Sequence, residues 1–357
     1  MANPEHADDE PGNPPEQPTL CDGDVTLRPW TYDDVEPARL QHDEEMAHWF
    51  GFPGVVPPAE RQRAAVEQWH ADYADNRKVV AFLVQHGDQV AGTVEVRQRG
   101  DGVGELSWAV FRDHRGRGVG ARAVRLLIDY CFADLGLVRV GASVEVGNTA
   151  SMRTASRAGL RREGLRRSAE TTGDRRPDFV RLARLADDPA PSTREGFIGV
   201  LNAGLPTKRV IGQGLLRSTT GKVLLCELTY KREWDLPGGV VDASESPAAA
   251  VSREIHEELG IEPEVGDLRV VDWMPPWRGW DDACLFVFDA GVHEESVVEG
   301  LVLQPREIVA VHWCTLEEAR PHIPEYLEVL LTRLLEPATG PVYLENGREP
   351  TDLSELT

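Results

Sequence analysis

Hydrophobic positions in the first half of the chain follow the periods of strands and helices in turn. Apolar residues recur at helical spacing over 121–137 and 149–159, and Thr31 with Asp34 has the spacing of a capping box ahead of another helix. Five stretches alternate or run apolar between turn residues and predict mostly antiparallel strands, at residues 25–30, 78–85, 89–97, 104–111 and 139–146. This pattern predicts a mixed α/β unit.

The second half of the chain also predicts both strands and helices, in a different order and with different lengths. A helix is predicted from Pro324 onward, with leucines on one face, and Thr315 with Glu318 has capping-box spacing. A loop followed by a helix is predicted over 239–261. Strands are predicted at 208–218, 222–230, 268–274, 283–290 and 308–314. The expected architecture is a mixed sheet between helices.

Apolar periodicity is lost at three places, which predict the domain boundaries. Residues 1–20 are polar, acidic and rich in proline, as in a disordered tail. The stretch 186–195, ADDPAPSTRE, is small, charged and proline-containing, as in a linker. We therefore expect one domain at 21–185, a second at 196–340, and a C-terminal tail at 341–357.

Composition narrows the classes of function. The net charge is −22, with 60 acidic and 38 basic residues, which disfavours generic binding to nucleic acid. No apolar run approaches the length of a membrane span. The five cysteines are scattered without a pairing pattern, which favours a reduced, cytoplasmic setting.

Three glutamates in the second segment crowd onto one side of a predicted helix. Glu254, Glu257 and Glu258 stand at i, i+3 and i+4, where like charges repel each other. Three carboxylates on one face are suitable ligands for Mg²⁺ or Mn²⁺, and a cation would offset their repulsion. The alternative is an ordinary solvated acidic face, which is common in helices.

The residues around these glutamates complete a longer motif. The stretch fits G-x5-E-x7-R-E-U-x-E-E-x-G-U, where U is a bulky aliphatic residue, and it resembles the Nudix hydrolase box without departure. The resemblance implies hydrolysis of a nucleoside diphosphate linked to another group, at a metal site comprising Gly239 and the three glutamates. The specified positions are filled by Gly239, Glu245, Arg253, Glu254, Ile255, Glu257, Glu258, Gly260 and Ile261.

The same resemblance suggests roles for neighbouring residues. We expect Arg253 to orient a glutamate by ion pairing and Glu245 to brace the loop. Family members often add a glutamate from a later loop as base or ligand, for which Glu307 is the first candidate and Glu299 the second, although either can be plain surface. Trp273, Trp277 and Trp280 cluster near Pro276, and they can stack on a base or simply flank a turn.

Glycines in the first segment precede a predicted helix. The sequence Arg115-Gly116-Arg117-Gly118-Val119-Gly120 follows a strand, and such a turn aims backbone N–H groups and the helix dipole at one point, where a pyrophosphate can bind. A plain turn explains such glycines equally well. A later asparagine, Asn148, ends another strand and precedes a helix.

Together these features resemble GNAT acetyltransferases. Arg115, Gly118 and Gly120 match that superfamily's acetyl-CoA loop, and the resemblance implies that Asn148 contacts the pantetheine arm of the co-substrate. The tyrosine that many members use as general acid is replaced by Ala155. The layout resembles the ribosomal-protein N-terminal acetyltransferase branch, which implies Ser151 as proton donor to the thiolate and Glu170 as base.

Two further residues compete for roles in this domain. Glu105, on the strand before the loop, is the rival base, and His114 lies inside the loop but is expected to be a surface residue. The leading interpretation is a GNAT fold followed by a Nudix α/β/α sandwich, with acetyl-CoA, an amine and a nucleoside diphosphate derivative as substrates. The alternatives are a GNAT unit that only binds acyl-CoA, or a Nudix unit that senses a nucleotide and regulates acetylation.

Overall fold

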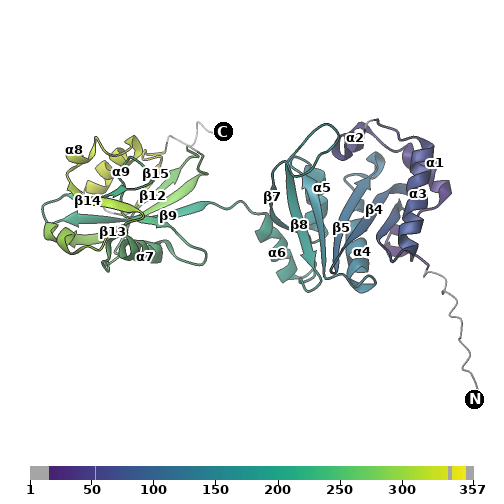
Figure 1. The fold of residues 1–357 in the computed structure, drawn as a ribbon, viewed down its shortest axis with the longest axis horizontal. Helices are drawn as coiled ribbons and strands as arrows, with labels where there is room; N and C mark the ends of the chain where they lie inside the picture. Colours follow the sequence, from purple (N-terminus) through teal and green to yellow (C-terminus); the bar gives the residue numbers. More distant parts are fainter. Residues whose placement is uncertain (1–15, 53, 278, 337–339, 351–357) are drawn as a thin grey trace, which may run out of the picture. The chain divides into compact units, whose positions relative to one another are not determined.

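The chain folds into two compact units that divide between Leu205 and Pro206. The computed structural model describes residues 16–52, 54–277, 279–336 and 340–350. Both units contain a β-sheet with helices packed against it (Figure 1). The fold class is therefore α/β in both, and each unit is described by itself.

The sheet of the first unit has eight strands in the described residues, in the order β1-β2-β3-β4-β5-β6-β8-β7. Neighbours are antiparallel except β5 and β6, which run parallel. This single parallel pair positions the site described below. The strands are β1 (Leu20–Asp22), β2 (Val25–Pro29), β3 (Val79–His86), β4 (Gln89–Gly100), β5 (Val103–Val110), β6 (Arg139–Glu145), β7 (Arg161–Arg166) and β8 (Phe179–Leu185).

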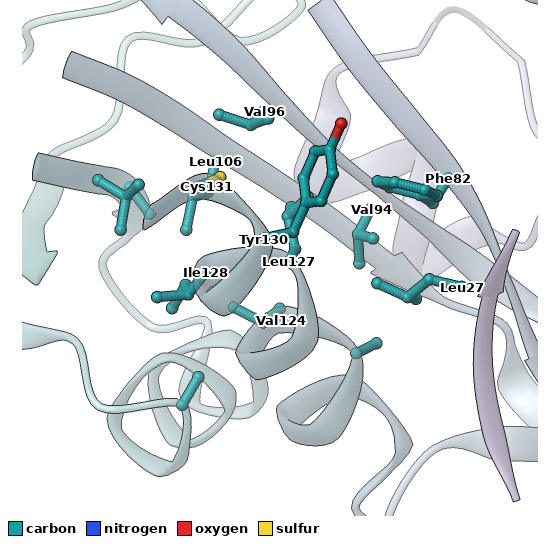
Figure 2. Packing of buried hydrophobic residues seen from close by; sticks show 14 of the residues in the cluster. Leu27, Phe82, Val94, Val96, Leu106, Val124, Leu127, Ile128, Tyr130 and Cys131 are labelled. Carbon is teal, nitrogen blue, oxygen red and sulfur yellow. The ribbon is translucent and has the colours of Figure 1, made fainter. Parts of the chain in front are cut away.

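Both faces of this sheet are buried, which explains the continuous apolar run in β3. Successive side chains in a strand point to opposite faces. Phe82 accordingly packs in the cluster with α4, whereas Leu83 packs in the cluster with α3. Figure 2 shows Leu127 and Ile128 of α4 among the apolar side chains of the first cluster. The helices are η1 (Tyr32–Asp34), α1 (Val35–Arg39), α2 (Glu44–Phe50), α3 (Ala59–Ala74), η2 (Arg112–His114), α4 (Val119–Ala133), α5 (Thr149–Arg157) and α6 (Arg194–Gly204).

The boundary between the units differs from the one expected at 186–195. Helix α6 begins at Arg194 and contacts β7, so it belongs to the first unit. Thr193 caps the helix by accepting a hydrogen bond from the Gly196 N–H at 3.1 Å. The proline-containing stretch leads into this helix, and the units separate about ten residues later, after Leu205.

The second unit is built on a seven-stranded sheet of described residues. Its order is β14-β10-β9-β13-β12-β15, and β11 pairs with β9. The central strands β9 and β13 run parallel over most of their length. The strands are β9 (Arg209–Ser218), β10 (Val223–Leu228), β11 (Gly238–Val240), β12 (Leu268–Met274), β13 (Ala283–His293), β14 (Ile308–Cys314) and β15 (Val342–Glu345).

Helices cover both faces of this sheet and give an α/β/α sandwich. Helix α7 (Pro247–Leu259) buries Ile255 in one cluster, and α9 (Glu325–Leu335) buries Leu327 in the other. The predicted capping box is present, because Thr315 and Glu318 bond reciprocally at the start of α8 (Leu316–Ala319). The short η3 (Glu295–Gly300) follows β13.

One prediction about the C-terminal segment is wrong in part. Residues 342–345, expected to lie in a tail, form β15, which pairs in parallel with β12. The strand is held by pairing with a distant segment, and Leu344 is fully buried. Residues 351–357 of this predicted tail lie outside the described residues, as do residues 1–15 of the predicted N-terminal tail. Among the described residues, none of the helices combines the length and apolar character that crossing a membrane requires.

Candidate active sites

A cleft opens in the first unit where two parallel strands separate. Strands β5 and β6 are paired only from Val103–Glu105 to Arg139–Gly141. Beyond that point they line opposite sides of a cavity of about 420 Å³, through Leu106–Val110 on one side and Ser143–Glu145 on the other. Backbone groups that have left the pairing can bond a ligand instead. The wedge therefore suits an extended molecule that carries amides.

The predicted glycine loop lies at the mouth of this cleft. Gly116 and Gly118 have φ values of 75° and 79°, which other residues rarely adopt. Gly118 is the N-cap of α4, so the N–H groups of the first helical turn are directed into the cleft. A Cβ at Gly120 would lie 3.0 Å from the Val110 side chain, so this glycine allows α4 to approach β5.

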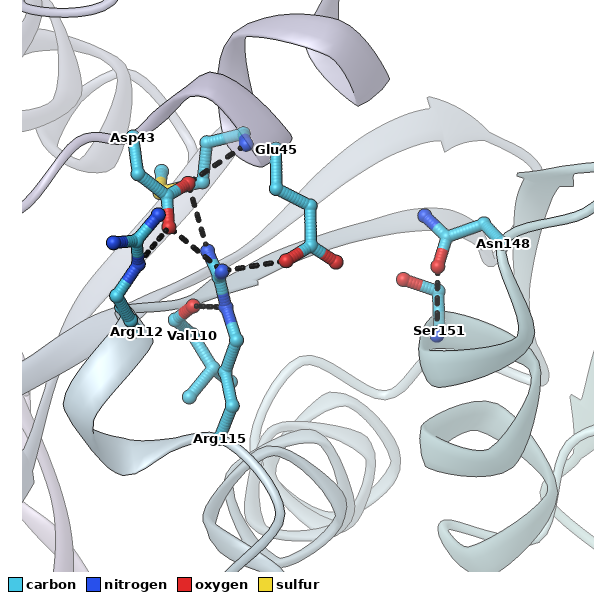
Figure 3. Close-up of polar contacts among 8 residues, drawn as sticks. Asp43, Glu45, Val110, Arg112, Arg115, Asn148 and Ser151 are labelled. Atoms are coloured by element: carbon cyan, nitrogen blue, oxygen red, sulfur yellow. Dashed lines mark hydrogen bonds and ion pairs between the residues drawn. The ribbon is translucent and has the colours of Figure 1, made fainter.

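The guanidinium of Arg115 forms ion pairs with acidic residues at the edge of the cleft. Its guanidinium donates to Asp43 at 2.7 and 3.1 Å and to Glu45 at 2.7 Å, and its Nε donates to the Val110 carbonyl at 2.8 Å (Figure 3). The arginine thus ties the glycine loop to the start of α2. Of the other predicted loop residues, Arg117 is exposed and does not line the cleft, whereas Val119 is buried and does line it.

Asn148 and Ser151 lie together at the opposite wall. The Asn148 side-chain oxygen accepts a hydrogen bond from the Ser151 N–H at 3.0 Å and caps α5 (Figure 3). Both residues line the cleft. Ala155 is fully buried in the core, so a larger side chain does not fit there. Two residues of α5 that carry a hydroxyl group line the cleft, Ser151 and Thr154, and Ser151 is the nearer of them in sequence to Asn148.

The two predicted bases lie elsewhere. Glu170 is half exposed and pairs with Arg166 at 2.7 Å, and Glu105 receives two 2.6 Å hydrogen bonds from Arg181. Neither is among the described residues that line the cleft. His114, expected at the surface, is buried and lines the cleft instead. Burial lowers the pKa of His114, which favours the neutral imidazole.

The sequence did not single out two acidic residues of the first unit. Asp43 caps α2 and accepts bonds from Arg115, and Glu145 is buried against Arg175 at 2.6 Å beside the cleft. Asp43 does carry a local signal, because an aspartate directly before a helix is a common N-cap. The Arg175 partnership joins segments far apart in sequence and carries no local signal.

In the second unit, Arg253 joins the loop before α7 to the helix itself. Its guanidinium donates two 2.9 Å bonds to Glu245 and single bonds of 2.8 and 3.2 Å to Glu254 and Glu257. A further bond of 3.2 Å reaches the Val240 carbonyl. The bond with Arg253 lowers the pKa of Glu245 to about 2, so the pair is charged at neutral pH. The arginine fixes the loop and one side of the acidic helix together.

The predicted acidic face is partly buried, unlike a solvated surface. Glu258 is only 4% exposed and accepts a hydrogen bond from the Gly238 N–H at 2.9 Å. Burial raises the pKa of Glu258 to about 8, with nearby carboxylates adding to the effect, and burial also raises the pKa of Glu254. A Cβ at Gly239 would lie 2.6 Å from the Glu254 carboxylate, so glycine leaves room for it.

This donor set fits a hard divalent cation in its chemistry. Glu254 and Glu258 are crowded carboxylates whose repulsion a cation relieves, and Glu307 is close enough to raise the pKa of both. In the conformation described, no three acidic, histidine or cysteine side chains within the described ranges converge closely enough to hold a metal ion. Arg253 occupies oxygens of Glu254 and Glu257, so these side chains must turn for a cation to bind.

The predicted tryptophan cluster is only partly at the surface. Trp277 and Trp280 are 52% and 60% exposed and pair with each other through a short bridge. The Arg209 guanidinium lies 4.8 Å from the centre of the Trp280 ring, in a cation–π contact. Trp273 belongs to strand β12. A stacking role for these residues stays a prediction.

The two units match the models of two different domain families. The model of the acetyltransferase (GNAT) domain matches residues 24–161, and the model of the NUDIX domain matches residues 208–332. The chain is therefore a fusion of a GNAT domain and a Nudix domain, and the recognition of both families from sequence is confirmed.

Curated relatives match one unit or the other. The uncharacterized N-acetyltransferase p20 of Bacillus licheniformis is 34% identical over 29% of this chain, which spans 60% of that protein. The MutT-like protein of Streptomyces ambofaciens is 29% identical over 40% of this chain and 87% of its own length. An RNA pyrophosphohydrolase of Psychrobacter cryohalolentis is 37% identical over 17% of this chain and 36% of its own length.

Proposed function

We propose that this chain is a bifunctional enzyme that joins acetyl transfer to metal-dependent hydrolysis. The first unit takes acetyl-CoA and an amine, with the pyrophosphate of the co-substrate on the Gly116–Gly120 loop and its pantetheine arm beside Asn148. The second hydrolyses a nucleoside diphosphate linked to another group, with Mg²⁺ or Mn²⁺. A cytoplasmic location, where these substrates occur, stays part of the proposal.

In acetyl transfer, the amine nitrogen forms a bond to the thioester carbon and the carbon–sulfur bond breaks. The amine loses one proton and the coenzyme thiolate gains one. Ser151, whose hydroxyl lies on the cleft wall, is the proton donor to the thiolate. The acceptor of the amine proton is not one of the predicted bases in their present positions, since Glu105 and Glu170 both lie in ion pairs away from the cleft.

In hydrolysis, water forms a bond to phosphorus and a bridging phosphorus–oxygen bond breaks, which gives a nucleoside monophosphate and a phosphorylated product. Glu254, Glu257 and Glu258 would hold the cation, which would supply charge neutralisation and make the attacking water more acidic. Arg253 positions Glu254 and fixes the loop through Glu245. Glu307, beside these carboxylates, is the candidate for accepting the proton of the attacking water.

The observation that carries the proposal is that the predicted motif of each unit lies where a ligand can reach it or where carboxylates crowd together. The glycine loop lies at the mouth of the wedge between β5 and β6, and the acidic helix lies against the glycines of β11. The full-length protein should release free thiol from acetyl-CoA in an amine-dependent way. It should also release phosphatase-sensitive products from a panel of nucleotide sugars and dinucleotides when Mg²⁺ is present.

A second candidate is favoured by one observation. Neither predicted base lines the cleft, and the position of the usual tyrosine is a buried alanine, Ala155. The first unit would then bind acyl-CoA without transferring its acyl group. Calorimetric titration with acetyl-CoA separates the two candidates, because saturable binding without transfer to any amine supports the binding unit alone.

A further inference from the structure

A second cavity of the first unit opens beside the wedge cleft. It has a volume of about 670 Å³ and lies over β4 and β5, on the side of the sheet where α2 and α3 pack. Met46, Phe50, Ser107 and Ala109 line both cavities. The second cavity, here called the aromatic pocket, therefore adjoins the cleft along this shared wall. Its volume lies in the usual range of pockets that bind a small molecule or a few residues of a peptide.

The walls of this pocket are mostly aromatic. Trp30 and Trp69 have ring centres 5.2 Å apart, and Phe50 stacks on Phe52 at 5.5 Å. Phe111 closes another side and is almost fully buried. Rigid aromatic surfaces give a large contact area to an apolar or aromatic ligand, and they offer little to a strongly hydrated one.

Two buried polar atoms of the pocket residues lack partners. Among the described residues, neither Nε1 of Trp30 nor Nδ1 of His42 has a hydrogen-bond partner. Trp30 is 3% exposed, so its N–H donor is removed from water. The N–H of Trp30 is therefore inaccessible from the pocket as well, and the surface that this ring presents to a ligand is apolar.

Glu95 is the acidic residue among the described residues that line the pocket. Glu95 on β4 lies directly opposite Ser107 on β5 in the strand register, next to the shared wall. Glu95 accepts a hydrogen bond of 3.5 Å from Arg97, which is half exposed and does not line the pocket, and Arg61 is the cationic residue among the described residues that line it. Burial lowers the pKa of His42, so this ring is neutral and does not offset Glu95. The carboxylate favours a cationic group at the junction of the two cavities.

We infer that the aromatic pocket selects the acceptor of acetyl transfer, which is a primary amine attached to an aromatic or bulky apolar group. The ammonium is drawn to Glu95 beside Ser107, and the apolar group fills the space between the aromatic walls. This inference rests on the proposed acetyltransferase function, because it names the substrate class of that site.

Phenylalaninamide and glycinamide are matched probes, since both have an α-amine and a carbonyl and differ in the aromatic group. We expect kcat/KM with acetyl-CoA to be at least tenfold higher for phenylalaninamide, and calorimetry on the full-length protein to detect its binding more tightly than that of glycinamide. Equal values for the two amines in both measurements would overturn the inference.

Two alanines on α3 supply a variant with its own control. Ala65 lines the pocket, whereas Ala64 is exposed on the same helix and does not line it. Ala65→Trp should fill the pocket and weaken phenylalaninamide binding at least tenfold, while acetyl-CoA binding is retained and Ala64→Trp behaves as wild type. Unchanged amine binding in Ala65→Trp contradicts the inference.

Binding and turnover distinguish this inference from the proposed function. If phenylalaninamide binds in an Ala65-dependent way but no amine is acetylated, the pocket assignment stands and the transferase proposal fails. If amines are acetylated without regard to the aromatic group, the transferase proposal stands and the pocket assignment fails. Glu95→Gln should raise KM for phenylalaninamide more than it changes kcat, because its carboxylate acts on binding.

Discussion

The Arg253 guanidinium holds the Glu245 carboxylate through two hydrogen bonds of 2.9 Å. This bidentate pair connects the loop before α7 to the helix that carries Glu254, Glu257 and Glu258. A planar guanidinium can bond Glu245 and Glu254 at the same time, and a lysine ammonium cannot reproduce that fork. The pair therefore fixes the position of the acidic face relative to β11.

The first prediction concerns this fork. Arg253→Lys keeps the charge and loses the bidentate geometry, so we expect hydrolysis of a nucleotide substrate to fall 10- to 100-fold with the fold retained. The control is Arg320→Lys, a surface arginine that pairs with Glu328 away from α7. Steady-state kinetics at saturating Mg²⁺ provide the measurement. Equal kcat values in the two variants would count against a positioning role for Arg253.

The second prediction concerns the acidic face. Glu258→Gln keeps the shape of the side chain and its acceptor for Gly238 N–H, but removes a carboxylate that can bind a cation. We expect hydrolysis to fall at least a hundredfold, because a ligand of the cation is lost. The metal-free protein should be no less stable in thermal unfolding, since burial raises the pKa of Glu258 to about 8 and a glutamine at this buried position never ionises. The exposed Glu262→Gln serves as control, and near-normal turnover in Glu258→Gln would exclude Glu258 as a ligand.

The third prediction concerns the glycine loop. Gly118→Ala puts a side chain at φ +79°, in the wall of the cleft, and the left-handed conformation costs about 1–2 kcal/mol. Gly136→Ala is a matched control, because Gly136 has φ +63° with open space around it and lies past the far end of α4. Both variants should lose similar stability, but Gly118→Ala alone should weaken acetyl-CoA binding, at least tenfold by calorimetry. Equal affinities would remove the phosphate-binding role of the loop.

The fourth prediction separates Ser151 from Glu170. Ser151→Ala should leave acetyl-CoA binding near normal and slow acetyl transfer, because a proton donor at the cleft wall is lost. Glu170→Gln should leave both unchanged, since Glu170 pairs with Arg166 and does not line the cleft. Single-turnover rates at several pH values provide the measurement. A slow Glu170→Gln with a flattened alkaline rise in rate would instead support Glu170 as the base.

The fifth prediction concerns a buried carboxylate in the second unit. Asp272 is fully buried and accepts a bond from the Gly347 N–H at 2.9 Å, and burial raises its pKa to about 6. Because the pKa in the folded state exceeds the ordinary 3.8, the folded state binds the proton more tightly. The resulting stability is complete below about pH 4 and is lost as the pH rises through about 6, amounting to at most about 3 kcal/mol.

Asp272→Asn should therefore stabilise the second unit at pH 7 to 8 and flatten its stability between pH 4 and 6. The Asn oxygen can keep the bond to Gly347, and its amide group replaces an oxygen that has no partner among the described residues. Chemical denaturation across this pH range provides the test, with the exposed Asp281→Asn as control. A pH profile that remains as steep as that of the wild type would show that Asp272 does not govern it.

Much of the fold could be predicted because its signals are local. Strand β3 has a continuous apolar run, and both capping boxes, Thr31 with Asp34 and Thr315 with Glu318, are present where the spacing placed them. The motif around Glu254 specifies residue types at fixed spacing, so it identified the Nudix domain directly. Local sequence is sufficient where the physical requirement is itself local.

Other features depend on contacts between distant segments. Helix α3 buries only Val66 and Tyr73, so its apolar face is too narrow to stand out in sequence. Strand β15 has only four residues and is held by β12. Arg115 forms ion pairs with Asp43 and Glu45, which belong to a distant segment of the chain. The aromatic pocket likewise brings together Trp30 and Trp69 from separate elements. Such groupings cannot be inferred from residue spacing along the chain.

The central claim is that one chain carries two separate active sites, and paired assays of the full-length protein test it most directly. Amine-dependent thiol release from acetyl-CoA and Mg²⁺-dependent nucleotide hydrolysis are measured in the wild type, Ser151→Ala and Glu257→Gln. The account predicts that the wild type has both activities, that Ser151→Ala loses only the first and that Glu257→Gln loses only the second. Absence of either activity in the wild type, or loss of both in one variant that remains folded, would contradict it.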